Sequence, residues 1–156
     1  MLTRRLWLGR DDITFTQGQI DRAFDDKQTR LWVVRRADIK LLAAQVDRCI
    51  ETDDFQVRVT CVKRADFEVT DARFTILMSD ENSNIPREVI RESNKRGHDL
   101  APFVAAAFRQ GYPRVLTGML KAEMPFTDAQ LAAGSNSADR DVKIAFCRIH
   151  GQHCNR

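Results

Sequence analysis

Residues 55–78, FQVRVTCVKRADFEVTDARFTILM, decide the predicted fold because apolar and polar side chains alternate along them. Three short runs show the alternation, at 55–61, 67–69 and 74–78. A period of two indicates a strand with one buried and one solvated face. Because short polar turns separate the runs, the stretch predicts an antiparallel β-meander.

Two further strands are predicted outside this stretch. Residues 31–34, LWVV, form a short apolar run that is rich in β-branched side chains. Near the C-terminus, residues 142–148 alternate again, with Val142, Ile144 and Phe146 on one face. This last strand could return to the meander.

Helices are expected before and after the meander in the sequence. Thr16 followed by Gln19 forms a capping box that predicts a helix over about 17–26. Apolar residues at helical spacing predict a second helix over 39–51. Prolines that suit helix starts and glycines that suit helix ends mark a helical block over 86–133.

These elements together predict an α+β fold, in which the β-meander of about 55–78 and the strands near 31–34 and 142–148 pack with helices. The 156 residues are expected to form one domain, with a loose tail from about residue 150. No internal repeat is expected.

Composition places the chain among ordinary globular proteins, with 43% apolar and 30% charged residues. No stretch approaches the roughly 18 apolar residues of a membrane span, so no membrane association is expected. Cys49 and Cys61 lie in apolar runs, where a free thiol behaves as a small hydrophobic residue. A reducing, cytoplasmic location is therefore predicted. The net charge of +3 permits an anionic partner without requiring one.

Four basic pairs are candidates for nucleic-acid binding, because clustered cations neutralise phosphates and a nearby indole can stack on a base. Each pair falls at the end of a predicted element or in a turn, where basic residues also commonly face solvent. The candidate residues are Arg4, Arg5, Trp32, Arg35, Arg36, Lys63, Arg64, Lys95 and Arg96.

Two apolar segments exceed what the predicted core requires and are candidates for a protein interface. Leu6, Trp7 and Leu8 have no obvious place in the core. Phe103 and Phe108 lie on a helix that is apolar nearly all round, and such a helix is buried on all sides. That burial could come from a partner chain or from the centre of the monomer.

The C-terminal run is the only candidate metal site. Cys147, His150, His153 and Cys154 offer the sulfur and nitrogen ligands that zinc prefers. Their spacing is poor, since His153 and Cys154 are adjacent and cannot easily reach one ion together. The alternative is a strand end followed by a polar tail, and no other cofactor is expected.

The leading hypothesis is a non-enzymatic protein–protein interaction or assembly module that self-associates or is a subunit of a larger complex. The alternative is an RNA- or DNA-binding domain that uses the basic pairs. An enzyme is the third hypothesis, with His98, Asp99, Cys147 and His150 as the first residues to test, although no phosphate-binding loop or nucleophile motif occurs.

Overall fold

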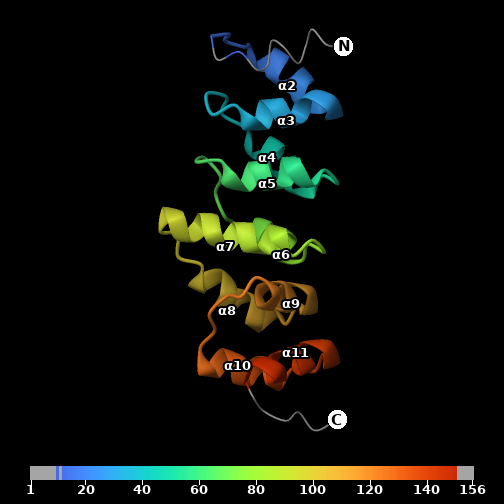
Figure 1. Ribbon diagram of the computed structural model, residues 1–156, viewed down its shortest axis with the longest axis vertical. Helices are drawn as coiled ribbons and strands as arrows, with labels where there is room; N and C mark the ends of the chain where they lie inside the picture. The colour runs from blue at the N-terminus through green and yellow to red at the C-terminus, as the bar shows by residue number, and fades with distance from the viewer. Residues whose placement is uncertain (1–9, 11, 151–156) are drawn as a thin grey trace. The chain divides into compact units, whose positions relative to one another are not determined.

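The computed structural model describes residue 10 and residues 12–150, and every regular element in that part of the chain is an α-helix. Ten helices, α2 to α11, follow one another, and no strand occurs among the described residues (Figure 1). The α+β prediction is therefore wrong. None of these helices is long and apolar enough to cross a membrane.

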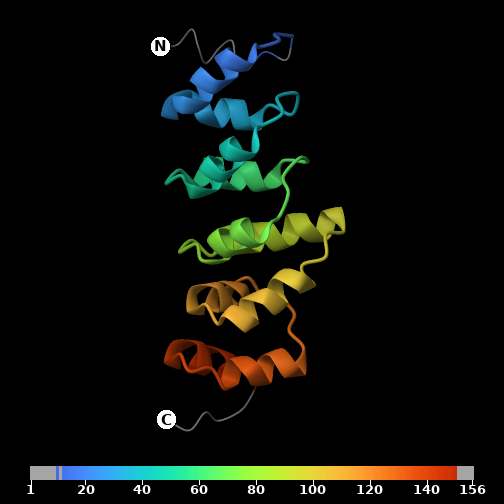
Figure 2. The same ribbon diagram turned by 180° about the vertical axis from the view of Figure 1, so that it is seen from behind.

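The chain divides into two compact units, Met1–Glu68 and Val69–Arg156, called here the N-terminal and C-terminal units. The N-terminal unit contains two helix pairs, visible from both sides in Figures 1 and 2, and α3 of the first pair packs against α5 of the second. Its helices are α2 (Gln17–Asp25), α3 (Lys27–Arg35), α4 (Ala43–Glu51) and α5 (Phe55–Lys63). Its core includes the fully buried Phe24, Val33 and Cys49.

The C-terminal unit contains three helix pairs, each joined by a short connection. The helices are α6 (Asp71–Met78), α7 (Asn84–Arg96), α8 (Ala101–Gln110), α9 (Pro113–Lys121), α10 (Asp128–Ser135) and α11 (Arg140–His150). Phe108, Phe126 and Phe146 form an aromatic cluster with ring centroids 5.4–6.0 Å apart. The ring of Phe146 is fully buried.

None of the five predicted strands is a strand: four lie in helices, and residues 67–69 belong to the connection between α5 and α6. Where helices form, capping and tertiary burial override the local alternation. In α5, Asp54 caps the helix by accepting hydrogen bonds from the main-chain N–H groups of Gln56 and Val57. The buried residues of α5 are Val57, Cys61 and Val62, which is helical spacing. The same holds for three other strand predictions: residues 31–34 lie in α3, 74–78 in α6 and 142–148 in α11.

The predicted helices at the start of the chain and in the 86–133 block are confirmed. Gln19 Oε1 accepts from the Thr16 main-chain N–H at 2.9 Å, which is the glutamine half of the expected capping box. Gly97 and Gly111 end α7 and α8 with φ of 67° and 65°, a left-handed conformation that favours glycine.

Helix pairs recur along the chain, so the expectation of no internal repeat is wrong. The tripeptide Arg-Ala-Asp occurs at 36–38 and again at 64–66, each time just before a helix pair. A weaker copy, Arg10-Asp11-Asp12, precedes α2 in the sequence. Helix pairs introduced by a recurring turn are typical of helical repeat proteins.

Candidate functional site

An arginine ladder joins successive turns of the N-terminal unit; we define it as Arg10, Arg36 and Arg64, which are 26 and 28 residues apart. The Arg36 guanidinium donates to the main-chain oxygens of Arg10 and Ile13 at 2.6 and 2.9 Å. Arg64 repeats the arrangement one turn later, donating to the oxygens of Arg36 and Ile39. Arg36 and Arg64 thus bind equivalent positions of the turns that precede them.

An aspartate two residues after each ladder arginine holds its guanidinium in place. Arg36 donates to Asp38 through Nε at 2.7 Å and Nη2 at 2.5 Å. Arg64 donates to Asp66 in the same fork, at 2.8 and 2.7 Å. This bidentate contact is the geometry in which arginine binds a carboxylate best. The guanidinium lowers the pKa of Asp38 and of Asp66 below the ordinary value, since it stabilises the charged form.

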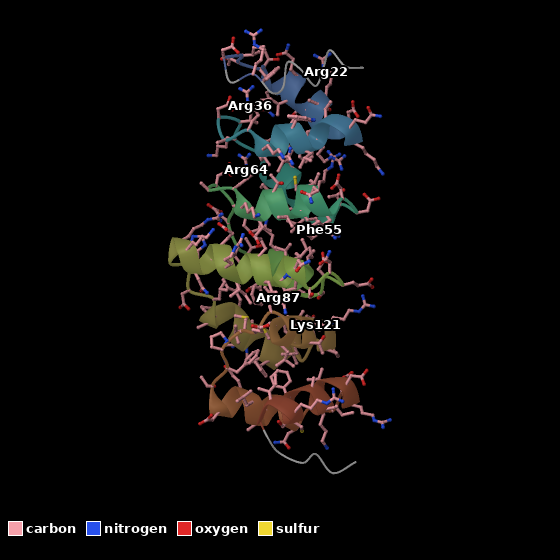
Figure 3. The ribbon with its side chains drawn as sticks, in the orientation of Figure 1. Arg22, Arg36, Phe55, Arg64, Arg87 and Lys121 are labelled. Atoms are coloured by element: carbon pink, nitrogen blue, oxygen red, sulfur yellow. The ribbon has the colours of Figure 1, made fainter. Side chains whose placement is uncertain are left out.

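The side chains of Arg36 and Arg64 are engaged by other groups of the protein. Arg36 and Arg64 are 5% and 9% exposed, and Figure 3 labels them at the turns that follow α3 and α5. Arg64 also donates to the main-chain oxygen of Val34 at 2.9 Å. All donors of this buried guanidinium point at carbonyls and a carboxylate of the chain itself. Its role is therefore structural.

A hollow of about 600 Å³ lies beside the ladder, between the turn after α3 and the turn after α5. We call it the basic hollow. Arg35, Lys40 and Lys63 are its exposed cations, and Asp38 and Asp66 also line it. Both carboxylates are partly exposed but paired with ladder arginines, so the three exposed cations give the lining a net positive charge. Its volume lies within the range of ligand-binding clefts.

Arg35 and Lys40 form no ion pair with any other residue in the described part of the chain. The Arg35 guanidinium lies over the Trp32 ring, 5.8 Å from its centroid. That contact restricts the side chain at the rim of the hollow without neutralising its charge. Two cations therefore remain available for an anionic ligand.

Leu42 breaks the capping pattern of the repeat beside this hollow. The residue before the first helix of a pair is Thr16, Thr70 or Thr127 in three other copies, and it is Leu100, which is buried, in the fourth. Leu42 has no side-chain oxygen that could accept a hydrogen bond from the N–H groups of α4. The contact that remains at this cap is the one that the Leu42 main-chain N–H donates to the Gln45 side-chain oxygen. The Leu42 side chain is 53% exposed. An exposed apolar residue thus replaces a stabilising polar one.

The basic pairs expected to bind nucleic acid do not all remain available. Arg36 and Arg64 are the buried ladder residues, whereas their neighbours Arg35 and Lys63 come together at the basic hollow. In the C-terminal unit, Lys95 and Arg96 lie 2.7 and 3.5 Å from the Glu92 carboxylate. Trp32 is half-buried beneath Arg35. Arg4 and Arg5 lie outside the described residues.

The expected interface residues Phe103 and Phe108 pack within the C-terminal unit. Phe103 stacks on Phe74 with ring centroids 5.5 Å apart, and both side chains belong to that unit. Phe108 contacts Phe126 and Phe146 edge-on. These contacts favour the reading in which this helix is the centre of its own unit. The other interface candidates, Leu6, Trp7 and Leu8, lie outside the described residues.

The expected zinc ligands are only partly described. Cys147 is buried and disulfide-bonded, so its sulfur is not a free thiolate for a metal. His153 and Cys154 lie outside the described residues, as does the side chain of His150. Within the described part of the chain, no three His, Cys, Asp or Glu side chains are grouped as metal ligands. Cys49 and Cys61 are buried thiols outside any disulfide among the described residues, as the apolar runs predict.

The third hypothesis placed acid–base chemistry at His98 and Asp99, and both are exposed. Asp99 accepts from the main-chain N–H of Ala101 at 2.9 Å, which is a turn contact at the start of α8. Nothing in the described surroundings orients His98 as a base. The pair therefore has the geometry of a capped helix start.

Sequence reasoning missed Lys40 and Leu42, and one signal could have found both. Aligning the two Arg-Ala-Asp copies sets Lys40 against Glu68 and Leu42 against Thr70, which shows the positions that differ between the copies.

Comparisons of the chain with protein-family models, with curated proteins and with solved structures give no match.

Proposed function

We propose that the chain is a non-enzymatic helical-repeat module that binds a protein partner as part of a larger complex. One observation carries the proposal: the residues that recur in the repeat are used inside the fold, while exposed positions beside them differ between copies. Arg36 and Asp38 recur as Arg64 and Asp66 and are bonded to each other and to the main chain.

The differing positions are those that a partner would meet. Lys40 corresponds to Glu68 in the next copy, and Leu42 corresponds to Thr70. All four side chains are exposed. A repeat that keeps its scaffold and varies its exposed turns matches the way helical repeats present extended binding surfaces. Functional residues of many folds lie on turns held by a rigid scaffold, for the same reason.

Leu42 supports a protein partner in particular. Replacing a capping threonine by leucine sacrifices a helix cap worth about 1 kcal/mol, and it leaves an apolar side chain in water. A partner that covers the side chain would recover its hydrophobic free energy. Apolar residues next to charged ones are typical of protein interfaces, whose centres are apolar and whose rims are polar.

Nucleic-acid binding is the second candidate, supported by the positive charge of the basic hollow. It is less well supported, because Arg36, Arg64, Lys95 and Arg96 are engaged by groups of this chain. Strong phosphate binding needs many cations that release counterions together.

Leu42→Thr tests the proposal, because it introduces the threonine of three other copies while removing the exposed apolar side chain. The whole protein is used as bait, and native mass spectrometry then measures which masses remain bound. We expect a protein partner or a second copy to be retained by the natural chain and lost with Leu42→Thr. The control is Ile149→Thr, which removes a side chain that is 57% exposed at the end of α11 and should leave binding unchanged.

Two results would contradict the proposal, and a third would change which residues form the interface. The native mass spectrum of the natural protein could show only the mass of a single chain, with nothing bound to it. Retained material could absorb at 260 nm and be released by salt, which would favour nucleic acid. Equal retention by the natural chain and Leu42→Thr would remove Leu42 from the interface.

A further inference from the structure

We infer that the basic hollow binds an acidic segment of the partner protein, with Arg35 and Lys40 as the residues that hold its carboxylates. The inference rests on the proposed function, because it names the chemistry of the partner that such a module would bind. It follows from the charge, the shape and the rigidity of the hollow, which are taken in turn.

The lining of the hollow has a net positive charge, because four cations and two carboxylates line it. Asp38 and Asp66 are turned toward Arg36 and Arg64, whose forked contacts occupy both oxygens of each carboxylate. Arg35 and Lys40 are exposed and make no ion pair among the described residues. A carboxylate entering the hollow therefore meets cations that the fold has left available.

The hollow is also large enough and rigid enough to select a ligand. Its volume of about 600 Å³ accommodates several side chains of a peptide. Its walls are the turns after α3 and α5. The Arg64 guanidinium joins them by donating a hydrogen bond to the Arg36 main-chain oxygen. Arg35 is restricted by the Trp32 ring beneath it. Because these groups are already ordered, less conformational entropy is lost when a ligand binds.

A peptide fits this lining better than a nucleic-acid backbone does. The carboxylates of Asp38 and Asp66 are partly exposed in the wall although they are paired, and a row of evenly spaced phosphates would lie against them, whereas a peptide can place its few carboxylates away from them. A peptide can set its acidic side chains against Arg35 and Lys40 and its main-chain N–H groups against the aspartates.

Fluorescence anisotropy of the whole protein with a labelled ten-residue peptide of alternating glutamate and serine tests the inference. We expect saturable binding that weakens as salt is raised, since screening acts on exposed charges. Arg35→Glu with Lys40→Glu should weaken binding about tenfold or more, because each carboxylate then meets a like charge. The milder pair Arg35→Gln with Lys40→Gln serves if the reversal disturbs the fold, which circular dichroism reports.

The matched control is Arg109→Glu with Arg114→Glu, which changes the net charge equally at exposed positions of the C-terminal unit. Equal weakening in the control, or no binding of the glutamate peptide, would overturn the inference. Tighter binding of a ten-nucleotide thymidine strand that responds to the same pair would assign the hollow to nucleic acid instead. If the natural chain retains a partner through Leu42 yet ignores the peptide, the proposed function stands and this inference alone fails.

Discussion

The Arg64 guanidinium donates to the main-chain oxygen of Arg36 at 2.9 Å, and Arg36 makes the same contact with Arg10 at 2.6 Å. Arg36 is thus both a donor through its side chain and an acceptor through its main chain. The contact binds one turn of the N-terminal unit to the next. The ladder does not continue in the sequence, because Gly97 stands two residues before Asp99, where the arginine would be.

Arg64→Met should destabilise the N-terminal unit by about 3–5 kcal/mol, because it leaves the Asp66 carboxylate and three buried carbonyl oxygens without their donor. Both tryptophans, Trp7 and Trp32, belong to this unit, so urea unfolding followed by tryptophan fluorescence measures it. Arg10→Met is the control, since the Arg10–Asp12 pair is exposed and should change the midpoint little. Similar losses in both variants would contradict the structural role of the ladder.

Acid should weaken the same unit through Asp66. Its pKa is lowered in the folded state by the hydrogen bonds from Arg64. The ion pair therefore contributes stability above the unfolded pKa of about 3.9, and this stability is lost as pH falls below that value. Asp66→Asn should flatten the acid limb of the unfolding free energy measured between about pH 5 and pH 2. In the Arg64→Met background the same substitution should change the limb little, because the partner is already gone.

Part of the fold follows from sequence, and the failed part has a specific cause. The helix after Thr16 and the helical block were predictable because caps, prolines and glycines act locally. Residues 55–61 alternate as a strand would, yet their helix is fixed by the Asp54 cap and by burial of Val57 and Cys61. Burial depends on residues distant in sequence, so periodicity over seven residues could not decide between the two structures.

The sequence predicted only part of the candidate site. Arg35 and Lys63 were noted as members of basic pairs, but the pairs gave no sign that the second member of each, Arg36 or Arg64, is buried. Spacing alone could have shown this, because the repeat of Arg-Ala-Asp after 28 residues marks scaffold positions. Which exposed cations meet in one hollow depends on how the two turns stack, and no local pattern encodes that.

Leu42→Thr should stabilise the N-terminal unit by about 0.5–1 kcal/mol. Threonine can accept from a main-chain N–H of α4 as Thr70 and Thr127 do at α6 and α10, whereas leucine cannot. The change is measured as a higher urea midpoint in tryptophan fluorescence. Leu42→Ala is the control, because it shortens the side chain without supplying a cap, and it should not raise the midpoint. A rise of equal size with alanine would assign the effect to exposed apolar area rather than to capping.

Gly118→Ala should destabilise the C-terminal unit, because α9 approaches α6 too closely for any side chain. An added Cβ would lie 1.7 Å from the main-chain oxygen of Met78, and a main-chain atom cannot move aside as a flexible side chain can. Overpacking of this kind costs about 1–3 kcal/mol or more, measured as a lower midpoint in circular dichroism. Gly18→Ala is the matched control in α2, where an added Cβ meets nothing within 4 Å. There alanine should raise stability by about 0.5–1 kcal/mol, since it restricts the unfolded chain without strain. Stabilisation by both substitutions would mean that α6 and α9 do not pack as closely as the Gly118 contact requires.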